Sequence, residues 1–300
     1  MRVNPNMVPD MLAAIQQSES SLQTALQQVS TGKSVNVPSD NPAAAANMVQ
    51  NTIETAAVDQ YTQNVSGVLN TVQTADSSLS SVVTSLTQAV SLGTEGANGT
   101  NSAANQQEIA VQIQGILSSV VSQANTKYQG SYLFGGTAST SQPYTADATS
   151  ASGYAYNGNN DVNSVQVGDN LNVQVNLPGS QIFSNSSANV LGSLQSLVTA
   201  LQSGNTTAIG TATNAVSAAL SYVSQQRVIY GNAESQLNSQ DTYLQQETVT
   251  LASQATSLTG VDLAKAATNL SQAETDNNAA LAAAAKVVPN TLLSYLSTPS

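Results

Sequence analysis

Apolar residues alternate at spacings of three and four, without a break, from residue 58 to residue 89. The positions are Val58, Tyr61, Val65, Val68, Val72, Ala75, Leu79, Val82, Leu86 and Ala89. This spacing puts all of them on one stripe of an α-helix, as in the seam of a coiled coil. A stripe of this length has to be buried against other helices, so the spacing predicts a mainly α fold.

A second apolar stripe recurs at every seventh residue in the C-terminal half of the chain. Its members are Val223, Tyr230, Leu237, Leu244, Leu251 and Leu258. The companion positions Arg227, Glu234, Asp241 and Thr248 are polar, which is typical of a helix with one edge in water. We predict that this stripe and Val58, Val65, Val72, Leu79 and Leu86 of the first stripe form the seam of a helical rod.

Both ends of the chain also carry helical patterns. Near the N-terminus, the apolar positions are Val8, Leu12, Ile15, Leu22 and Leu26, with Glu19 as one acidic interruption, and Gly32 marks the end of the helix. Near the C-terminus, an Ala-rich helix is expected from residue 261 to residue 296, with Leu292, Leu293 and Leu296 at its end. These residues fit either an intramolecular core or a surface that many copies bury against one another.

Two further helix signals lie between these stripes. The run Pro38-Ser39-Asp40-Asn41-Pro42 predicts a helix start, because Asp40 or Asn41 can cap the free amides and Pro42 fits the first helical position. Glycines from residue 93 onward break the long stripe. A third helix then presents Ile109, Ile113, Ile116 and Val120 on one face.

The middle of the chain is rich in Gly, Asn, Asp, Ser and Thr and shows a different period. Val165 and Val167 precede a Gly168-Asp169-Asn170 turn, and Leu171, Val173, Val175 and Leu177 follow it with a period of two. This alternation predicts a β-hairpin that ends at Pro178-Gly179.

The predicted architecture is therefore a long coiled-coil-like helical rod with a small β-rich insert. We expect residues 1–35 and 262–300 to form a terminal helical assembly domain. Residues 36–136 and 187–261 are expected to form the rod domain, and residues 137–186 the insert.

The composition excludes several classes of function. The chain has 17 acidic and 6 basic residues, a net charge of −11, and neither Cys nor His. So few cations cannot form a basic stripe, so nucleic acid and membrane are not expected partners. Zinc, thiol and imidazole chemistry lack their side chains. We therefore predict no catalytic residue, no metal and no cofactor, and a protein that is not an enzyme.

Export without a cleaved signal peptide is expected. The start of the sequence lacks the apolar region of a signal peptide. No segment reaches the roughly 18–20 apolar residues that a membrane-spanning helix needs.

Three local patterns partly match known kinds of site, and each has a plainer interpretation. Gly32-Lys33-Ser34 could end a phosphate-binding loop, but Gln27 stands where that loop needs a glycine. The run from Asn157 to Asp161 lacks the spaced acids of a calcium loop. Glu234 and Asp241 lie one heptad apart and are interpreted as a solvated helix edge.

Three sequence motifs carry a resemblance to a known family. Residues 30–42, Ser-Thr-Gly-Lys-Ser-Val-Asn-Val-Pro-Ser-Asp-Asn-Pro, resemble the N-terminal signature of the flagellar hook-associated protein 3 family of the bacterial flagellin superfamily. The runs Tyr132-Leu133-Phe134-Gly135-Gly136 and Gln181-Ile182-Phe183 are similar to two later motifs of that family. Flagellins usually carry a Lys-Asp-Asp-Ala-Ala-Gly type of run where this chain has Pro-Ser-Asp-Asn-Pro.

The resemblance implies an extracellular structural subunit of the bacterial flagellum at the hook–filament junction. It also implies a ring of identical subunits, contacts with hook-associated protein 1 and flagellin, and a flagellar export chaperone in the cytoplasm. Residues 8, 12, 15, 22, 26, 292, 293 and 296 are then the expected assembly interface. Residues 269–274 and 288–296 also resemble the end of a flagellin, so a flagellin-type filament subunit is the alternative. A secreted adhesin displayed by the insert is a third possibility.

Overall fold

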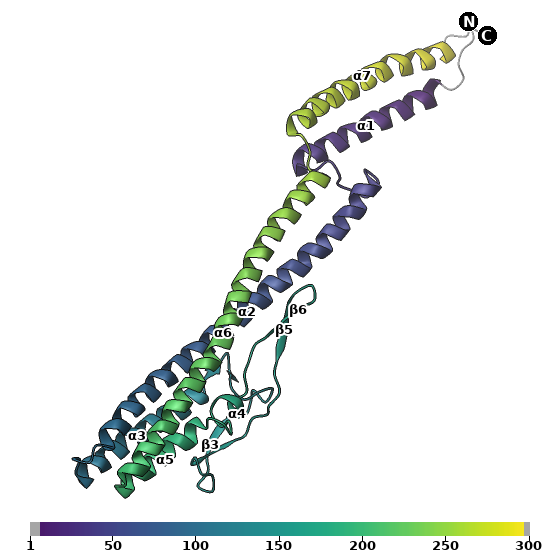
Figure 1. Cartoon of the computed structure of the whole chain (residues 1–300). Coiled ribbons are helices and arrows are strands. Elements are labelled where there is room, and N and C mark those ends of the chain that lie inside the picture. The colour runs from purple at the N-terminus through teal and green to yellow at the C-terminus, as the bar shows by residue number, and fades with distance from the viewer. Residues whose placement is uncertain (1–6, 297–300) are drawn as a thin grey trace. The chain divides into compact units, whose positions relative to one another are not determined.

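The fold is mainly helical, as predicted. A computed structural model describes the backbone of residues 7–296 and the side chains of residues 9–286. Its helices are α1 (Met7–Thr31), α2 (Pro42–Gly96), α3 (Ala103–Ala124), α4 (Gly179–Ile182), α5 (Val190–Ser203), α6 (Thr206–Thr259) and α7 (Leu263–Leu296) (Figure 1). Its strands are β1 (Lys127–Tyr128), β2 (Ser131–Tyr132), β3 (Tyr144–Ala146), β4 (Tyr154–Tyr156), β5 (Ser164–Gly168) and β6 (Leu171–Gln174). The strands pair in sequence order as three antiparallel two-stranded sheets.

The chain divides into two compact units. The first comprises residues 1–57 and 247–300, and the second comprises residues 58–246. The long helices α2 and α6 each contribute a part to both units. The first unit also contains α1 and α7, and the second contains α3, α4, α5 and all the strands.

The core of the second unit is built from large aliphatic and aromatic side chains. Nine of the ten stripe positions from residue 58 to residue 89 are buried, and Tyr61 is half-buried. The predicted α3 face is buried as well, and α3 packs against α5. The largest fully buried side chains are Tyr144, Phe134, Phe183, Leu79, Leu86, Ile113, Leu117, Ile182, Leu191, Leu194, Leu197 and Leu201. Each buried Leu contributes about 1.5–3 kcal/mol relative to exposure, so this core stabilises the unit by hydrophobic burial.

Local signals set the ends of the packed helices in this unit. Ser102 caps α3 by accepting a hydrogen bond from the Asn105 amide, and Asn189 caps α5 through the Gly192 amide. At the other end of α5, Gly204 has a left-handed backbone with φ 69°, which a glycine adopts without steric cost.

The polar edge of the α6 stripe contacts α2 in the second unit. The Nε and Nη2 of Arg227 donate to the two carboxylate oxygens of Asp76, each at 2.9 Å. The hydrogen bond to Asp76 raises the pKa of Arg227. Farther along α6, Glu234 accepts a 2.9 Å hydrogen bond from the Gln73 side-chain amide. These side chains are half-buried or exposed, so this edge of α6 is in contact with solvent and is also linked to α2 by hydrogen bonds.

The β-rich segment shares its core with the helices of the second unit. The predicted hairpin is present as β5 and β6, with Val167 and Val173 buried. Its second strand ends at Gln174 and not, as predicted, at Pro178-Gly179. The Tyr230 hydroxyl of α6 accepts a 3.0 Å hydrogen bond from the Leu177 amide, and burial raises the pKa of Tyr230. At the hairpin turn, the Tyr61 hydroxyl of α2 donates to Asp169 at 3.0 Å.

Candidate assembly interface

Helices α1 and α7 of the first unit lie side by side and run in opposite directions (Figure 1). Their buried contact residues are small: Ala25 on α1, and Ala266 and Ala273 on α7. Side chains of this size let two helix backbones approach closely but remove little apolar surface from water. The buried part of this contact is therefore made of Ala and not of large side chains.

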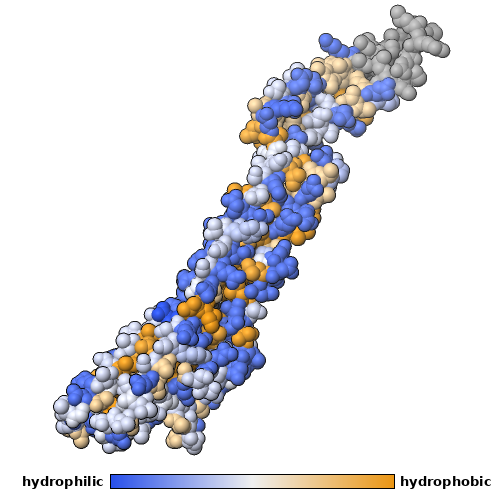
Figure 2. Space-filling model, in the orientation of Figure 1, coloured by the Kyte–Doolittle hydropathy of each residue, from blue (hydrophilic) through white to orange (hydrophobic). Residues whose placement is uncertain are grey.

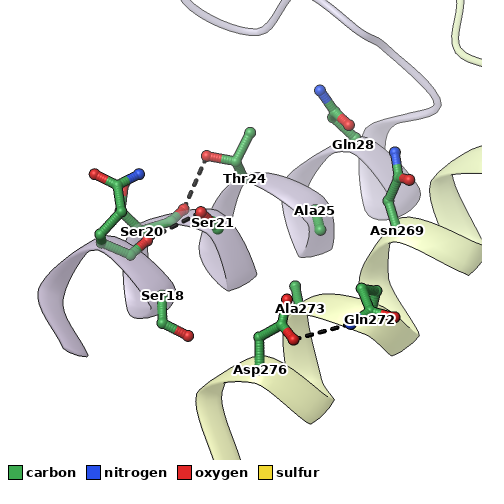
Figure 3. A pocket seen from close by; sticks show the side chains of 11 residues that line it. Ser18, Ser20, Ser21, Thr24, Ala25, Gln28, Asn269, Gln272, Ala273 and Asp276 are labelled. Carbon is green, nitrogen blue, oxygen red and sulfur yellow. Dashed lines mark hydrogen bonds between the residues drawn. The ribbon is translucent and has the colours of Figure 1, made fainter. Parts of the chain in front are cut away.

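One flank of the α1–α7 pair is polar. A groove on this flank is lined by Gln17, Ser18, Ser20, Ser21, Thr24 and Gln28 of α1 and by Asn269, Gln272 and Asp276 of α7, around Ala25 and Ala273. Figure 3 shows Ala25 and Ala273 between the two helices and the bond from the Gln272 amide to Asp276, which measures 2.9 Å. No Leu, Ile or Val lines the groove.

The groove contains a hydroxyl that the fold leaves without a partner. Among the described residues, the Ser18 Oγ is the buried side-chain oxygen that has no hydrogen bond. A buried hydroxyl without a partner costs about 1–3 kcal/mol. The contact between α1 and α7 is thus neither large in apolar area nor complete in hydrogen bonding.

The opposite flank of the pair is apolar. A turn of 3.6 residues places Leu12 and Leu26 on the side of α1 away from the polar groove residues, with Ile15 and Leu22 between that side and Ala25. Leu12 is 56% exposed and Leu26 47% exposed, and the other two are half-buried. The same construction gives α7 an apolar flank, with Leu263 60% exposed, Leu281 50% exposed and Leu270 half-buried. Apolar side chains are visible among polar ones on the surface of this pair in Figure 2.

The linker that follows α1 and the linker that precedes α7 hydrogen-bond to each other. Lys33 and Gly260 form an antiparallel bridge. The Ser34 amide donates to the Thr259 carbonyl at 2.6 Å, and the Val261 amide donates to the Gly32 carbonyl at 3.1 Å. Gly260 has no room for a side chain, since a Cβ there would clash with the Thr256 carbonyl oxygen. The α1–α2 and α6–α7 connections are therefore joined through backbone atoms.

The polar residues of the run 38–42 have separate structural tasks in the first linker. Asn41 caps α2 by accepting from the Ala44 amide, and Pro42 is the first helical residue, as predicted. Asp40 does not cap the helix, because its carboxylate accepts from the amides of Val37 and Asn36 at 3.0 and 2.8 Å. These two backbone hydrogen bonds, Val37 first, lower the pKa of Asp40. Gly32 ends α1 with φ 68°, which confirms the predicted left-handed cap.

The predicted site residues fall into three groups. Leu12, Ile15, Leu22 and Leu26 lie on the apolar flank of α1, whereas the side chains of Val8, Leu292, Leu293 and Leu296 are outside the described residues. The predicted seam residues Val58, Val65, Val72, Leu79, Leu86, Val223, Tyr230, Leu237, Leu244 and Leu251 are buried, and Leu258 is half-buried. Their assignment to an assembly interface and a rod seam stays a prediction.

Sequence reasoning missed the apolar flank of α7 before residue 292. Leu263, Leu270 and Leu281 stand in an Ala-rich stretch, where isolated Leu residues gave no clear stripe. A helical wheel could have found them. With 3.6 residues per turn, the three Leu residues of α7 fall together on one side of Ala266 and Ala273.

Within the described side chains, no group of three or more Asp, Glu, His or Cys residues could hold a metal ion. None of the described helices combines the length and hydropathy needed to cross a membrane. Glu234 and Asp241, considered above as an acid pair, bond Gln73 and Gln245 respectively.

Comparisons with known proteins assign the family. The N-terminal helical region of bacterial flagellin matches residues 3–139, and the C-terminal helical region matches residues 213–296. Flagellar hook-associated protein 3 of Salmonella typhimurium is 28% identical over 193 residues, which cover 64% of this chain and 59% of that protein. The Escherichia coli protein of the same name is 33% identical over 122 residues, which cover 40% of this chain and 38% of that protein. The crystal structure of Bacillus cereus FlgL aligns with a TM-score of 0.60 at 25% identity, covering 69% of this chain and 99% of that one.

The two matched regions are the two helical ends of the fold, and together they cover about three quarters of the chain. The chain therefore belongs to the bacterial flagellin superfamily. Within it, the chain is similar to the flagellar hook-associated protein 3 type, which confirms the resemblance found in the motifs. The alignments span less than two thirds of the length of these two curated relatives.

Proposed function

We propose that this chain is an extracellular structural subunit of the bacterial flagellum that joins hook-side proteins to the filament. The two-sided α1–α7 pair is the observation that carries this proposal. A water-soluble helix pair normally turns its large apolar side chains inward, yet this pair turns Ala inward and leaves Leu12, Leu26, Leu263 and Leu281 about half exposed. Neighbouring subunits would cover that flank.

In this proposal, residues 1–35 and 262–300 form the assembly domain, and Val8, Leu292, Leu293 and Leu296 belong to its assembly interface. The partners are further copies in a ring, hook-associated protein 1 and flagellin, with an export chaperone before secretion. The exposed Leu side chains of the α1–α7 pair are already about half covered. Covering the rest would contribute roughly 0.8–1.5 kcal/mol for each, half of the value for a fully exposed Leu. Association also has an entropic cost that opposes this gain. No catalytic residue, metal or cofactor belongs to the proposed role.

The test compares the two flanks of the pair. The triple variant Leu12→Ser, Leu26→Ser, Leu281→Ser alters the apolar flank. The matched control, Gln17→Ser, Thr24→Ser, Gln272→Ser, alters the groove. Both proteins should be secreted and should melt like the wild type as monomers, because none of these six side chains is buried. Only the apolar-flank variant should leave cells with hooks that shed their filaments.

Electron microscopy of labelled protein on isolated flagella checks where the subunit lies along the flagellum. A single band between hook and filament is expected, whereas label along the whole filament would identify a filament subunit instead. Retention of filaments by the apolar-flank variant at the wild-type level would overturn the proposed interface.

A further inference from the structure

The loop between α2 and α3 contains an Asn-Gly pair whose surroundings favour a reaction of the backbone with the side chain. We propose that Asn98 is a site of spontaneous deamidation in the folded protein, and that the chain's other Asn-Gly pair, Asn157-Gly158, is protected by the fold. The proposal is independent of the flagellar role.

The reaction needs the backbone nitrogen of the following residue to reach the side-chain carbonyl carbon of Asn. The nitrogen of Gly99 attacks Cγ of Asn98, a C–N bond forms, and the side-chain amide leaves as ammonia after taking up the proton of the Gly99 N–H. A five-membered succinimide results. Water then opens the ring at either carbonyl, which gives aspartate or an isoaspartyl linkage. No oxidant or reductant takes part, and water is the co-reactant.

The electrophile is polarised in this loop. The Oδ1 of Asn98 accepts hydrogen bonds from the Thr100 amide at 3.2 Å and from the Thr100 hydroxyl at 3.0 Å. Donors aimed at an oxygen on which charge develops stabilise the transition state of such an attack. The same bonds hold the Asn98 side chain against the backbone two residues further on, as in an Asx-turn.

The nucleophile lies in an open part of the loop. Within the part of the chain that the structure describes, the Gly99 N–H donates to no group, whereas the Asn98 amide bonds the Glu95 carbonyl and the Asn101 amide bonds the Asn98 carbonyl. A Cβ at Gly99 would meet nothing within 4 Å, so the loop leaves open space on that side. Glycine also permits the backbone rotation that ring closure requires.

The second Asn-Gly pair is held in place. The Nδ2 of Asn157 donates to the Thr145 hydroxyl at 2.8 Å, and its backbone amide donates to the Pro143 carbonyl at 2.8 Å. Gly158 is enclosed as well, because a Cβ there would fall within 2.7 Å of both the Tyr156 side chain and the Gly135 carbonyl. Ring closure at Asn157 therefore first requires local opening of the β3–β4 segment.

The product would place a new negative charge near the C-terminal end of α2 and three residues after Glu95. Negative charge is unfavourable at the carbonyl end of a helix. An isoaspartyl linkage also adds one methylene to the main chain of the loop. Aged protein should therefore be heterogeneous at this loop in both charge and backbone length.

The experiment incubates the purified full chain in mildly alkaline buffer and follows both pairs by peptide mapping with mass spectrometry. In the folded protein, Asn98 should convert at least about tenfold faster than Asn157, because Asn157 must first break its hydrogen bonds. In concentrated urea the two rates should converge. The variant Gly99→Ala should slow conversion at Asn98 by about tenfold, since a side chain hinders ring closure, without changing the melting temperature or the rate at Asn157.

Thr100→Ala removes one of the two donors to the Asn98 oxygen and should slow conversion several-fold, which tests the polarisation separately. Equal or faster conversion at Asn157 in the folded chain would overturn the proposal. Conversion at Asn98 that is indifferent to Gly99→Ala would overturn it as well.

Discussion

The two units of this chain are built largely from helices, but they bury different side chains. The second unit fills its interior with Leu, Ile, Val, Phe and Tyr. Among the described side chains of the first unit, one large aliphatic residue is buried, Leu251. The other buried side chains described there are small or polar: Ala25, Ala44, Asn51, Thr259, Ala266 and Ala273. A buried methyl group stabilises far less than a buried Leu. The comparison teaches that the second unit carries a core of large side chains, whereas the first buries mainly small and polar ones and joins its linkers through backbone hydrogen bonds.

Aromatic packing sharpens the contrast. Phe134 and Phe183 meet edge to face with ring centroids 5.4 Å apart, and Tyr144 packs on Phe183 in the same manner at 5.9 Å. Such pairs add about 0.5–1.5 kcal/mol beyond their buried area. These rings come from the β-rich segment and its borders, so that segment stabilises the second unit and is more than an appended loop.

The largest expected effect is a loss of stability on truncating a Leu, and it should differ between the two units. Leu79→Ala removes a fully buried side chain from the second unit and should lower the free energy of unfolding by about 2–5 kcal/mol. Leu26→Ala in the first unit should change it by no more than about 0.5 kcal/mol in the monomer, because Leu26 is 47% exposed. Urea denaturation followed by circular dichroism measures both. Similar losses for the two variants would refute the comparison.

A smaller effect is expected from the ion pair in the second unit. A double-mutant cycle with Asp76→Ala and Arg227→Ala should give a coupling energy of about 0.5–1 kcal/mol, since both side chains are about one third exposed and water screens the pair. The coupling should shrink at high salt. The Asp241–Gln245 contact within α6 is the control, and its coupling should not respond to salt to the same extent.

The backbone bridge in the first unit gives a local prediction. Val261→Pro removes the N–H that bonds the Gly32 carbonyl, so the neighbouring Ser34 amide should exchange its hydrogen about fivefold faster. Leu263→Pro is the matched control, because Leu263 is the first residue of α7, where proline is tolerated. Hydrogen exchange of Ser34 measures both variants. An unchanged rate in Val261→Pro would show that the two linkers do not support each other.

The smallest effect concerns pH in the first linker. The pKa of Asp40 is lowered in the folded protein, so its carboxylate stabilises the turn at pH values above its unfolded pKa of about 4. That stabilisation is lost as the pH falls through the lowered pKa. The amides of Asn36 and Val37 should then exchange faster while the second unit remains folded. The variant Asp40→Asn should show the faster exchange already at neutral pH and should lose the pH dependence.

Several elements could be predicted from the sequence because their signals are local. The three–four spacing fixed which face of α2 is buried, since a helix repeats every 3.6 residues whatever it packs against. The alternation around Gly168-Asp169-Asn170 gave the β5–β6 hairpin, and Gly32 and Pro42 gave the ends of α1 and α2. Cys and His are absent from the sequence, and this absence alone removed whole classes of chemistry from consideration.

Other features depend on residues far apart in the chain, and only the tertiary structure decided them. Arg227 meets Asp76 across 151 positions, and Ser34 meets Thr259 across 225. Neither pairing produces a periodic pattern in the sequence. The β3–β4 hairpin was also missed, because it is short and built around Tyr residues with no clear alternation.

The terminal helices show the difference between what the sequence determined and what the tertiary structure decided. The sequence determined that α1 has an apolar stripe, because Leu12, Ile15, Leu22 and Leu26 recur at helical spacing. It could not determine that the partner helix would bind beside this stripe, through Ala25, and leave Leu12 and Leu26 about half exposed. Periodicity records which residues share a face, whereas the choice of the covering element depends on the packing of the whole chain.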